Sequence, residues 1–213
     1  MPQPRPLAVS PTLSRWATVI HSVPARAAPA PDATAIARLE TQTPEQTSNA
    51  VLALGTAVDG AGRLWVRVRL PVLPNNSTGW MPRDALGPYT FVSTRLVVDL
   101  QRLTVSLLVN GIAVFRAPVG VGMPSSPTPT GEFYIRNKLI RYRSPFYGPV
   151  AFGTSARSRF LTDWPAGGFI GIHGTNQPEL LPGRVSHGCI RMRNPDIVEL
   201  ARLLPVGTPL TIR

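Results

Sequence analysis

The sequence is sparing with the residues that supply most site chemistry. Its 213 residues include one cysteine, Cys189, three histidines and one lysine, Lys138. A single cysteine excludes an internal disulfide, so the cysteine count does not settle the redox compartment. Charged residues make up only 15% of the chain, against about 25% in an average soluble protein. No apolar run approaches the roughly 20 residues that a membrane-spanning helix needs, so we predict no transmembrane segment.

Proline, glycine and arginine are abundant instead. The 24 prolines and 18 glycines make up about a fifth of the chain, against a usual share of about 12%, which predicts many turns and few long helices. The net charge of +11 comes almost entirely from arginine, whose planar guanidinium binds carboxylates and phosphates in a fork. No nucleic-acid module is recognisable and few aromatic residues lie among the arginines, so we expect no nucleic-acid partner.

The chain divides into three segments. Residues 1–12 carry four prolines and no apolar core segment, and we expect a disordered lead without a secretory signal. Residues 13–88 alternate strand-like pieces with Pro, Ala and Gly breaks, which predicts a small all-β unit. Its stretch RLWVRVRL (63–70) has the period-two pattern of a half-buried strand, with Trp65 and the arginines facing away from the aliphatic residues. The third segment, 89–213, begins after the Gly-Pro pair of LGPY.

A tight β-hairpin is the clearest local prediction in the third segment. Apolar residues alternate along 103–109 and again along 113–119, on either side of Asn110 and Gly111. An Asn-Gly pair readily takes the positive φ angles that a two-residue hairpin turn requires. The segment 124–133 that follows contains three prolines, which cannot donate to a strand ladder, and is therefore predicted to be a loop.

The C-terminal part is predicted to hold a buried strand, a helix and a last strand. GGFIGIHG (167–174) is apolar and ends by presenting His173. Asn194 followed by Pro195 is typical of a helix start, with Asn194 as the N-cap. The apolar residues that follow are spaced to cover one helix face; these are Ile197, Leu200, Ala201 and Leu204. The final TPLTIR is predicted to form the last strand.

Cys189 lies close in sequence to two of the three histidines. A free thiol has a pKa of about 8.5, and a neighbouring imidazole can take its proton and so activate it as a nucleophile. His187 is two residues away, and His173 lies 16 residues upstream beyond a loop that could return it to the sulfur. Gly188 would let a substrate backbone approach closely, and the amides of Gly188 and Cys189 could face a developing oxyanion.

Simpler interpretations exist for each of these residues. Cys189 alone would be a buried structural thiol, and His173 alone a histidine satisfied at a strand end. We take the third histidine, His21, as structural. His173, His187 and Cys189 together could also hold a catalytic zinc ion with one open position. Zinc sites with such ligands usually carry further Cys or His residues, so we predict neither a metal nor another cofactor.

The segments IHGTN and SHGCIRM together resemble the signature of the bacterial L,D-transpeptidase catalytic domain. The match places the signature on His173 and on Ser186 through Ile190, and the resemblance extends through Val92–Arg213. PTPTGEF resembles the family's substrate-side loop, and the C-terminal stretch resembles its closing helix and strand. In the N-terminal part, LWVRVRL and GWMPRDAL resemble bacterial SH3-like domains. The expected fold is therefore mainly β: an SH3-like small β-barrel at 13–88, then an L,D-transpeptidase-type β-sandwich at 89–213 with one or two short helices.

The resemblance implies a role for each matched residue. Cys189 would be the nucleophile and His173 the general base, with the Gly174 carbonyl fixing the tautomer of the His173 ring. Ser186 and His187 would shape the pocket, although His187 is the alternative base. Two features depart from the pattern: the loop 174–185 is short for the family, and Arg191 stands where many members have Asn. Arg191 could grip a substrate carboxylate or could be a solvated strand residue; we also expect Thr175 and Asn176 to bind substrate.

The expected substrate is a tetrapeptide stem of peptidoglycan. The cysteine would attack the carbonyl of the third residue, release D-alanine, and pass the acyl group to an amine, which forms a 3→3 cross-link. Water as acceptor would make the protein an L,D-carboxypeptidase, and a protein that only binds wall peptides is the alternative from another class. We expect a monomer, and by resemblance we expect it to work outside the cytoplasmic membrane.

The basic charge is compatible with that substrate. Residues 89–213 contain 14 basic and 6 acidic residues, a net charge of +8. A run of basic residues precedes the Cys-His segment: Arg136, Lys138, Arg141, Arg143, Arg157 and Arg159. These residues could meet the carboxylates of stem peptides and anionic wall polymers, or they could form an ordinary solvated basic face.

Overall fold

The structure is a computed structural model that describes residues 5–7, 12–144, 146–160 and 168–213; for Pro6 and residues 141–144 it describes only the backbone. The strands of the N-terminal half are β1 (Arg5–Pro6), β2 (Ser14–Thr18), β3 (Val23–Arg26), β4 (Ala35–Leu39), β5 (Ala50–Val58), β6 (Leu64–Arg69), β7 (Thr78–Pro82) and β8 (Thr90–Val92), with the 3₁₀ turn η1 (Arg83–Ala85). The C-terminal half contains β9 (Thr94–Asp99), β10 (Thr104–Val109), β11 (Ile112–Pro118), β12 (Gly120–Gly122), β13 (Gly131–Ser144), β14 (Gly148–Arg157), β15 (Phe169–His173), η2 (Pro178–Leu180), β16 (Gly183–Ser186), β17 (Ile190–Arg191), α1 (Asn194–Leu203) and β18 (Pro209–Ile212).

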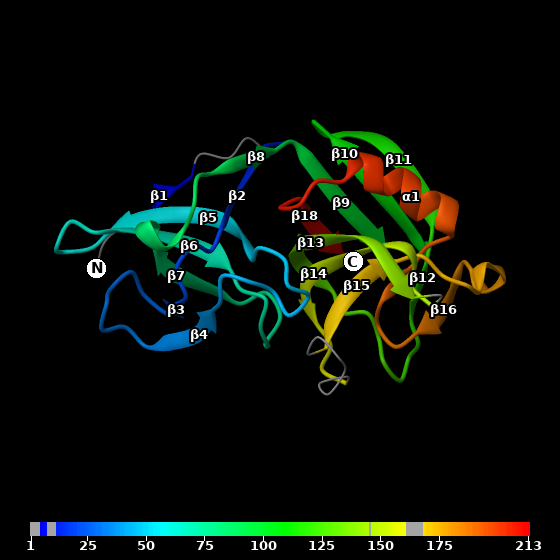
Figure 1. Ribbon diagram of the computed structural model, residues 1–213, viewed down its shortest axis with the longest axis horizontal. Coiled ribbons are helices and arrows are strands. Elements are labelled where there is room, and N and C mark those ends of the chain that lie inside the picture. Colours follow the sequence, from blue (N-terminus) through cyan, green and yellow to red (C-terminus); the bar gives the residue numbers. More distant parts are fainter. Residues whose placement is uncertain (1–4, 8–11, 145, 161–167) are drawn as a thin grey trace.

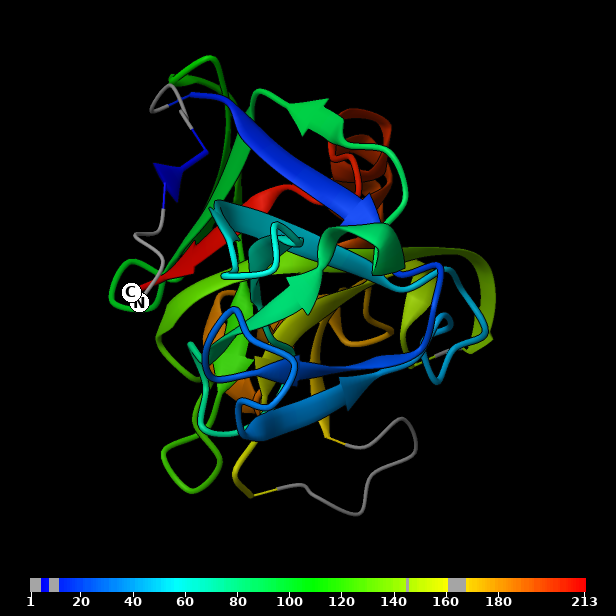
Figure 2. The same ribbon diagram turned by 90° about the vertical axis from the view of Figure 1, so that its left-hand side faces the viewer.

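The prediction of a mainly β protein is confirmed. Within the described residues the strands form two sheets, one of eight strands and one of ten. The two sheets lie side by side along the long axis of the molecule (Figure 1). Seen along that axis, the N-terminal sheet covers one end of the C-terminal half (Figure 2).

The N-terminal sheet runs in the order β4-β3-β7-β6-β5-β2-β8, and β1 pairs with β5. Strand β6 shows that both faces of this sheet bury apolar side chains. Val66 and Val68 are buried in the main N-terminal core, whereas Trp65, on the other face, packs with Trp80 in a cluster of its own. Trp65 is thus buried on the face that it was predicted to share with the arginines, because it packs against Ala57 and Trp80. Its indole N–H donates to Asp59 at 2.8 Å.

Of the predicted disordered lead, 1–12, residues 1–4 and 8–11 lie outside the described residues, while Arg5–Pro6 forms β1 and pairs with Gly55 and Thr56 of β5. At the other end of the N-terminal half, β8 still pairs with β2 of the first sheet. The second sheet begins two residues later with β9.

The C-terminal sheet runs in the order β11-β10-β9-β18-β13-β14-β15-β17-β12-β16. The long strand β13 holds its two parts together, since its first residues pair with β18 and the rest pairs with β14. The predicted hairpin is confirmed in β10 and β11: Val109 pairs with Ile112, and Asn110 and Gly111 take φ angles of 50° and 83°. The predicted loop is confirmed for residues 124–130 and wrong for 131–133, which begin β13 and pair with β18.

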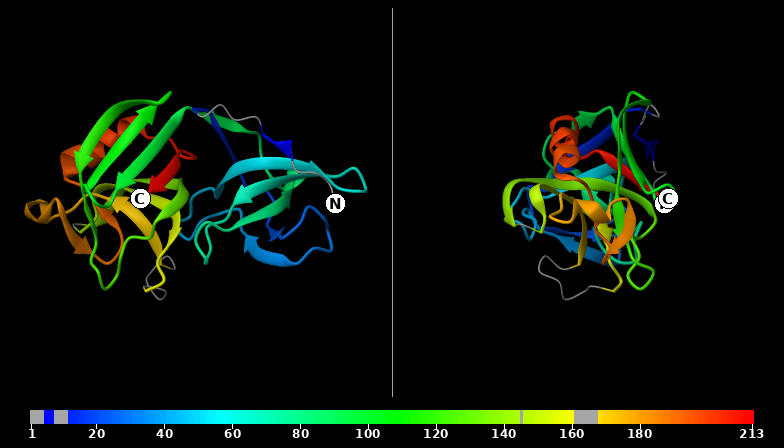
Figure 3. Two further views of the ribbon diagram at one scale, coloured as in Figure 1. Left: turned by 180° about the vertical axis from the view of Figure 1, so that it is seen from behind. Right: turned by 90° about the vertical axis from the view of Figure 1, so that its right-hand side faces the viewer.

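Helix α1 packs against β14 and closes the C-terminal core (Figure 3). All four residues that were predicted to form its apolar face are buried, namely Ile197, Leu200, Ala201 and Leu204. The predicted N-cap is wrong by one residue, because Arg193 occupies that position and makes no side-chain capping bond. Asn194 does not cap the helix because its side-chain oxygen accepts the Thr175 N–H at 3.0 Å instead.

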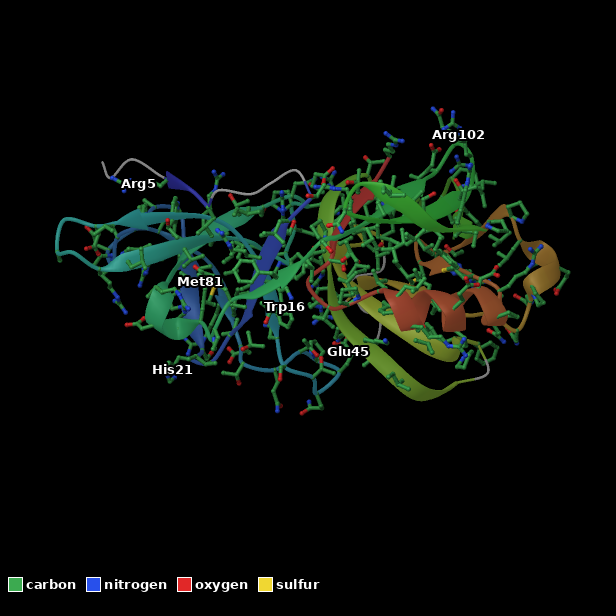
Figure 4. The ribbon with its side chains drawn as sticks, turned by 90° about the horizontal axis from the view of Figure 1, so that it is seen from above. Arg5, Trp16, His21, Glu45, Met81 and Arg102 are labelled. Atoms are coloured by element: carbon green, nitrogen blue, oxygen red, sulfur yellow. The ribbon has the colours of Figure 1, made fainter. Side chains whose placement is uncertain are left out.

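Polar contacts and one tryptophan join the two halves. Asn75 accepts the Arg157 N–H at 2.9 Å and donates to the Arg157 carbonyl at 2.8 Å. Trp16 lies against Gly207, in the turn that follows α1; a Cβ atom at Gly207 would come within 2.0 Å of the Trp16 ring. Figure 4 shows Trp16 and Glu45 where the halves meet. No helix among the described residues is long and apolar enough to span a bilayer.

The Trp16 contact can be tested with two glycines that share one backbone conformation. Gly207 and Gly62 both have φ +82°, but a Cβ atom at Gly62 would meet nothing within 4 Å. We expect Gly62→Ala to lower the free energy of unfolding by about 1 kcal/mol, the cost of a left-handed alanine. Gly207→Ala should lower it by roughly 1–3 kcal/mol more, because the methyl displaces Trp16. Urea denaturation of both variants measures the difference, and equal losses would show that this contact adds nothing.

Candidate active site

Parallel pairing of β15 with β17 brings the predicted site residues together. Ile172 pairs with Ile190, and His173 pairs with Arg191. Side chains two residues apart on a strand share one face, so Gly171 and His173 face the same way. Cys189 directly precedes β17, and its sulfur accepts the Gly171 N–H at 3.3 Å. The connection between these strands, which contains η2 and β16, therefore returns the thiol to the strand that carries the imidazole.

Gly171 keeps the space between ring and sulfur open. A Cβ atom at this position would lie 3.7 Å from Cδ2 of His173 and 3.9 Å from Sγ of Cys189. The ring edge and the thiol therefore border the same small volume, which a larger side chain at Gly171 would fill. Sequence reasoning missed this residue, although its spacing of two from His173 was a signal for the shared face.

The His173 ring is held as a neutral base. Its side chain is 4% exposed, and burial lowers its pKa to about 4, an effect that the hydrogen bond to Gly174 opposes and the charge of Arg191 assists. Nδ1 lies 2.6 Å from the Gly174 carbonyl oxygen. A carbonyl can only accept, so Nδ1 carries the proton and Nε2 keeps its lone pair. The Tyr147 ring packs on the imidazole at a centroid distance of 4.4 Å.

Asn194 supports the segment that carries the Gly174 carbonyl. Besides accepting the Thr175 N–H, its side-chain oxygen occupies the space that Cβ atoms would need at Gly174 and Gly148, at 2.3 and 2.4 Å. Both positions therefore require glycine. Sequence reasoning assigned Asn194 to helix capping and missed this contact, because Gly148 and Gly174 are brought together only by the fold.

The thiol of Cys189 is a neutral group at rest. Burial raises its pKa, while the Gly171 N–H and the charge of Arg191 act in the opposite direction. The residue is half-buried and stands at the pocket wall. A raised thiol pKa and a lowered imidazole pKa together favour the uncharged pair over a thiolate–imidazolium pair.

Ser186 and Gly188 shape the turn that precedes the cysteine. The buried Ser186 hydroxyl donates to the Cys189 carbonyl at 2.5 Å and accepts the Gly188 N–H at 3.1 Å. This second bond engages the Gly188 amide that was expected to face an oxyanion. Gly188 has φ +118°, which side chains rarely adopt, and a Cβ atom there would lie 3.0 Å from Ile170. The turn therefore requires glycine for its own geometry.

The proline-rich loop is tied to the same turn. Ser126 donates to the His187 carbonyl at 2.9 Å, and Thr128 donates to the Gly188 carbonyl at 2.7 Å. These bonds fix the backbone on both sides of the strained glycine. The segment that resembles the family's substrate-side loop thus lies beside the cysteine turn.

A pocket of about 360 Å³ opens on this site. Its wall includes His173, Ser186, His187, Cys189 and Arg191, together with the aromatic residues Phe146, Tyr147 and Phe169. Thr175 and Asn176, which were expected to bind substrate, do not line it: Thr175 is buried and Asn176 faces solvent elsewhere. Sequence reasoning missed the aromatic wall, because Phe146 and Tyr147 are brought beside Phe169 only by the fold.

The basic run does not form one patch. Arg136 is 1% exposed and ion-paired with Glu45 at 2.9 Å, and Lys138 donates to the Ala201 carbonyl at the end of α1. Arg159 is exposed, and the side chains of Arg141 and Arg143 lie outside the described residues. Arg136 is therefore a buried structural cation rather than a surface group for stem carboxylates.

The zinc alternative lacks a suitable ligand arrangement. In the part of the chain that the structure describes, no three His, Cys, Asp or Glu side chains are placed so that they could hold a metal ion. His173, His187 and Cys189 share the pocket but do not form such a group, and Nδ1 of His173 is already bonded to Gly174.

Comparison with known proteins identifies the family. Residues 93–212 match the YkuD model, the L,D-transpeptidase catalytic domain. A Bacillus subtilis protein named as an L,D-transpeptidase, YkuD, is 41% identical over 125 residues, which are 59% of this chain and 68% of that protein. Its Bacillus licheniformis namesake is 36% identical over 118 residues, 55% of this chain and 64% of that protein. The NMR structure of the E. faecium L,D-transpeptidase catalytic domain is 27% identical, with a TM-score of 0.42, over 56% of this chain and 96% of that one. The chain belongs to the L,D-transpeptidase family, which acts on the bacterial cell wall.

Burial of His173 should make folding pH-dependent. Its pKa is about 4 in the folded protein and about 6.5 when unfolded. Between these values the unfolded chain binds more protons, so stability is complete above about pH 6.5 and falls as the pH drops to about 4. In wild type, this effect should change the free energy of unfolding by about 3 kcal/mol across this pH range, and His173→Gln should remove that change. Urea denaturation from pH 4 to 7 tests it, with the exposed His187→Gln as control; the same curve for His173→Gln and wild type would refute it.

Proposed function

We propose that residues 89–213 catalyse peptidoglycan L,D-transpeptidation with Cys189 as the nucleophile and His173 as the general base. The observation that supports this proposal most is that the sulfur and the imidazole edge each lie within 4 Å of one point at Gly171. This shared volume belongs to an open pocket with an aromatic wall. The family indicates the reaction type, and in this chain the neutral imidazole can accept the proton of the neutral thiol as the thiol attacks.

In the acylation step, the Cys189 sulfur attacks the carbonyl carbon of the third residue of the donor stem. His173 Nε2 takes the thiol proton as the S–C bond forms, and the carbonyl π electrons move to oxygen. When the tetrahedral intermediate collapses, the C–N bond to D-alanine breaks. The imidazolium returns the proton to the departing amine, so D-alanine leaves and a thioester remains on Cys189.

In the transfer step, the amine of a second stem attacks the thioester carbonyl. His173 takes a proton from that amine, the new C–N bond forms, and the C–S bond breaks with the proton returning to sulfur. The product is a 3→3 cross-link. Attack by water along the same path would give a shortened stem, which is the carboxypeptidase outcome.

Assignment of the base to His173 follows from its environment. The Gly174 carbonyl holds the tautomer that leaves Nε2 unprotonated, and burial keeps the ring neutral at physiological pH. His187 has an exposed side chain and sits at the pocket wall on the far side of a strained glycine. We assign His187 and Ser186 to shaping the pocket.

For the oxyanion we retain the Cys189 N–H as a donor, because the Gly188 N–H already donates to Ser186. Arg191 lines the pocket opposite His173 in the β15–β17 register. We propose that its guanidinium binds a carboxylate of the donor stem. Thr175 acts through its backbone bond to Asn194 rather than on substrate.

Further assignments follow from the resemblance. We propose that residues 13–88 are an SH3-like unit, a small antiparallel sheet with its own core. We also propose that the protein is a monomer and acts outside the cytoplasmic membrane, where its stem substrate lies.

The nucleophile is tested with Cys189→Ala and a disaccharide tetrapeptide. We expect wild type to release D-alanine and to gain the mass of the acyl group, and the variant to do neither, because the chain has no other cysteine. A carbapenem should likewise add to wild type and not to the variant. Intact-mass spectrometry reads both reactions. D-alanine release by the variant would exclude Cys189, and a wild type that binds the stem without acylation would be a binding protein.

The base is tested by comparing His173→Gln with His187→Gln. Loss of the general base should slow acylation by at least about 100-fold, whereas His187→Gln should stay within about tenfold of wild type. Single-turnover acylation by the stem measures both rates, and circular dichroism checks that each variant is folded. A larger loss in His187→Gln would move the base role to that residue.

A further inference from the structure

The N-terminal unit sends one acidic side chain into the catalytic half. Glu45 lies at the tip of the turn between Thr43 and Thr47, whose backbones are bonded at 2.8 Å and whose hydroxyls are also 2.8 Å apart. Thr43 is 3% exposed. This turn is therefore a rigid support that projects Glu45 toward β13, at the junction of the two halves (Figure 4).

The partner of Glu45 is Arg136, which a β-bulge sets apart from the ladder. Ile135 pairs with Thr154 and Asn137 with Gly153, so Arg136 is the extra residue in β13. Such bulges redirect a side chain. Nη2 of Arg136 donates to both carboxylate oxygens of Glu45, at 2.9 and 3.0 Å. The side chains of Arg136 and Glu45 are 2% and 16% exposed.

Arg136 in turn lies over the ring of Phe169, which belongs to the pocket wall. Its guanidinium carbon is 3.8 Å from the centroid of the Phe169 ring, and that of Arg157 is 4.2 Å away. Phe169 lines the pocket that contains Cys189. Two guanidiniums therefore share one ring, and Glu45 supplies the counter-charge to the more deeply buried of them. Without that charge, an unpaired buried cation would be driven toward water and away from the ring.

A second connection leads from the same turn to the cysteine. The Asn137 amide donates to Glu45 at 3.0 Å and to Thr47 at 3.1 Å, and its oxygen accepts the Gly153 N–H at 2.9 Å. Gly153 pairs with Gly171 across β14 and β15. Gly171 is the residue whose N–H donates to the Cys189 sulfur.

We propose that Glu45 is a positioning residue for the donor stem: by holding Arg136 against Phe169, it fixes the pocket wall from the neighbouring unit. This inference rests on the proposed function, which supplies the stem as the molecule that lies against the wall. The N-terminal unit is then part of the substrate site and not only attached to it. Because Asn75 and Trp16 also join the halves, the units remain docked when the charge of Glu45 is removed.

The test compares Glu45→Gln with Glu40→Gln in the full chain. Glu40 belongs to the same unit, but its pair with Arg38 is exposed, 62% and 61%, so its loss should have little effect. We expect Glu45→Gln to raise KM for the disaccharide tetrapeptide roughly tenfold with a smaller change in kcat, since a displaced wall misaligns the stem. Alkylation of Cys189 by iodoacetamide does not depend on the pocket wall, and Asn137 keeps its bonds to Thr47 and Gly153 in this variant. Its rate should therefore stay within about twofold of wild type.

Two further measurements make the outcome unambiguous. In a Phe169→Leu background, Glu45→Gln should raise KM for the disaccharide tetrapeptide only slightly further, because both changes act on the same pocket wall. An equal KM for Glu45→Gln and Glu40→Gln, or parallel losses of stem reaction, alkylation and Tm, would overturn the proposal. If wild type is alkylated but never acylated by the stem, the proposed function fails. The positioning role is then judged by the ratio of two rates of Cys189 alkylation, that with N-phenylmaleimide and that with iodoacetamide. This ratio must differ between Glu45→Gln and Glu40→Gln.

Discussion

The active site depends on the parallel pairing of β15 with β17. This register places His173 opposite Arg191 and brings Cys189 beside Gly171, although 16 residues separate the two reactive side chains. Because Gly171 has no side chain, the ring edge and the sulfur border one open volume, since a Cβ atom there would contact both at 3.7 and 3.9 Å. The other features of the site, the Ser186 turn and the Asn194 contact, hold the two ends of this strand pair in place.

Burial gives this pair its electrostatic character. It lowers the pKa of His173 and raises that of Cys189, so both groups are uncharged before substrate arrives. The charge of Arg191 lowers the pKa of both groups. It therefore opposes protonation of the His173 ring and assists loss of the proton from the Cys189 thiol. A neutral pair needs no counter-ion, and in the proposed mechanism charge develops only as the thiol attacks.

The sequence allowed accurate prediction of the elements whose structure local chemistry alone determines. Asn110-Gly111 predicted its hairpin because positive φ angles are a local property, and the apolar spacing along α1 predicted its buried face. The proximity of Cys189 to His173 followed from the family resemblance. Gly171, Asn194 and Arg136 were missed or misassigned because their roles come from contacts with residues 18 to 91 positions away. Asn194 in particular satisfied a valid capping rule locally, and the fold used its side chain elsewhere.

The junction between the halves shows why a basic composition did not predict a basic surface. Arg136 appears in the sequence as one member of a cationic run, but a one-residue bulge in β13 turns it inward. There it meets the carboxylate of Glu45 and the face of Phe169. A buried guanidinium needs an anion, and here the neighbouring unit provides it. The two halves are therefore joined by an ion pair beside the pocket wall, and this contact is the physical basis of the positioning role proposed for Glu45.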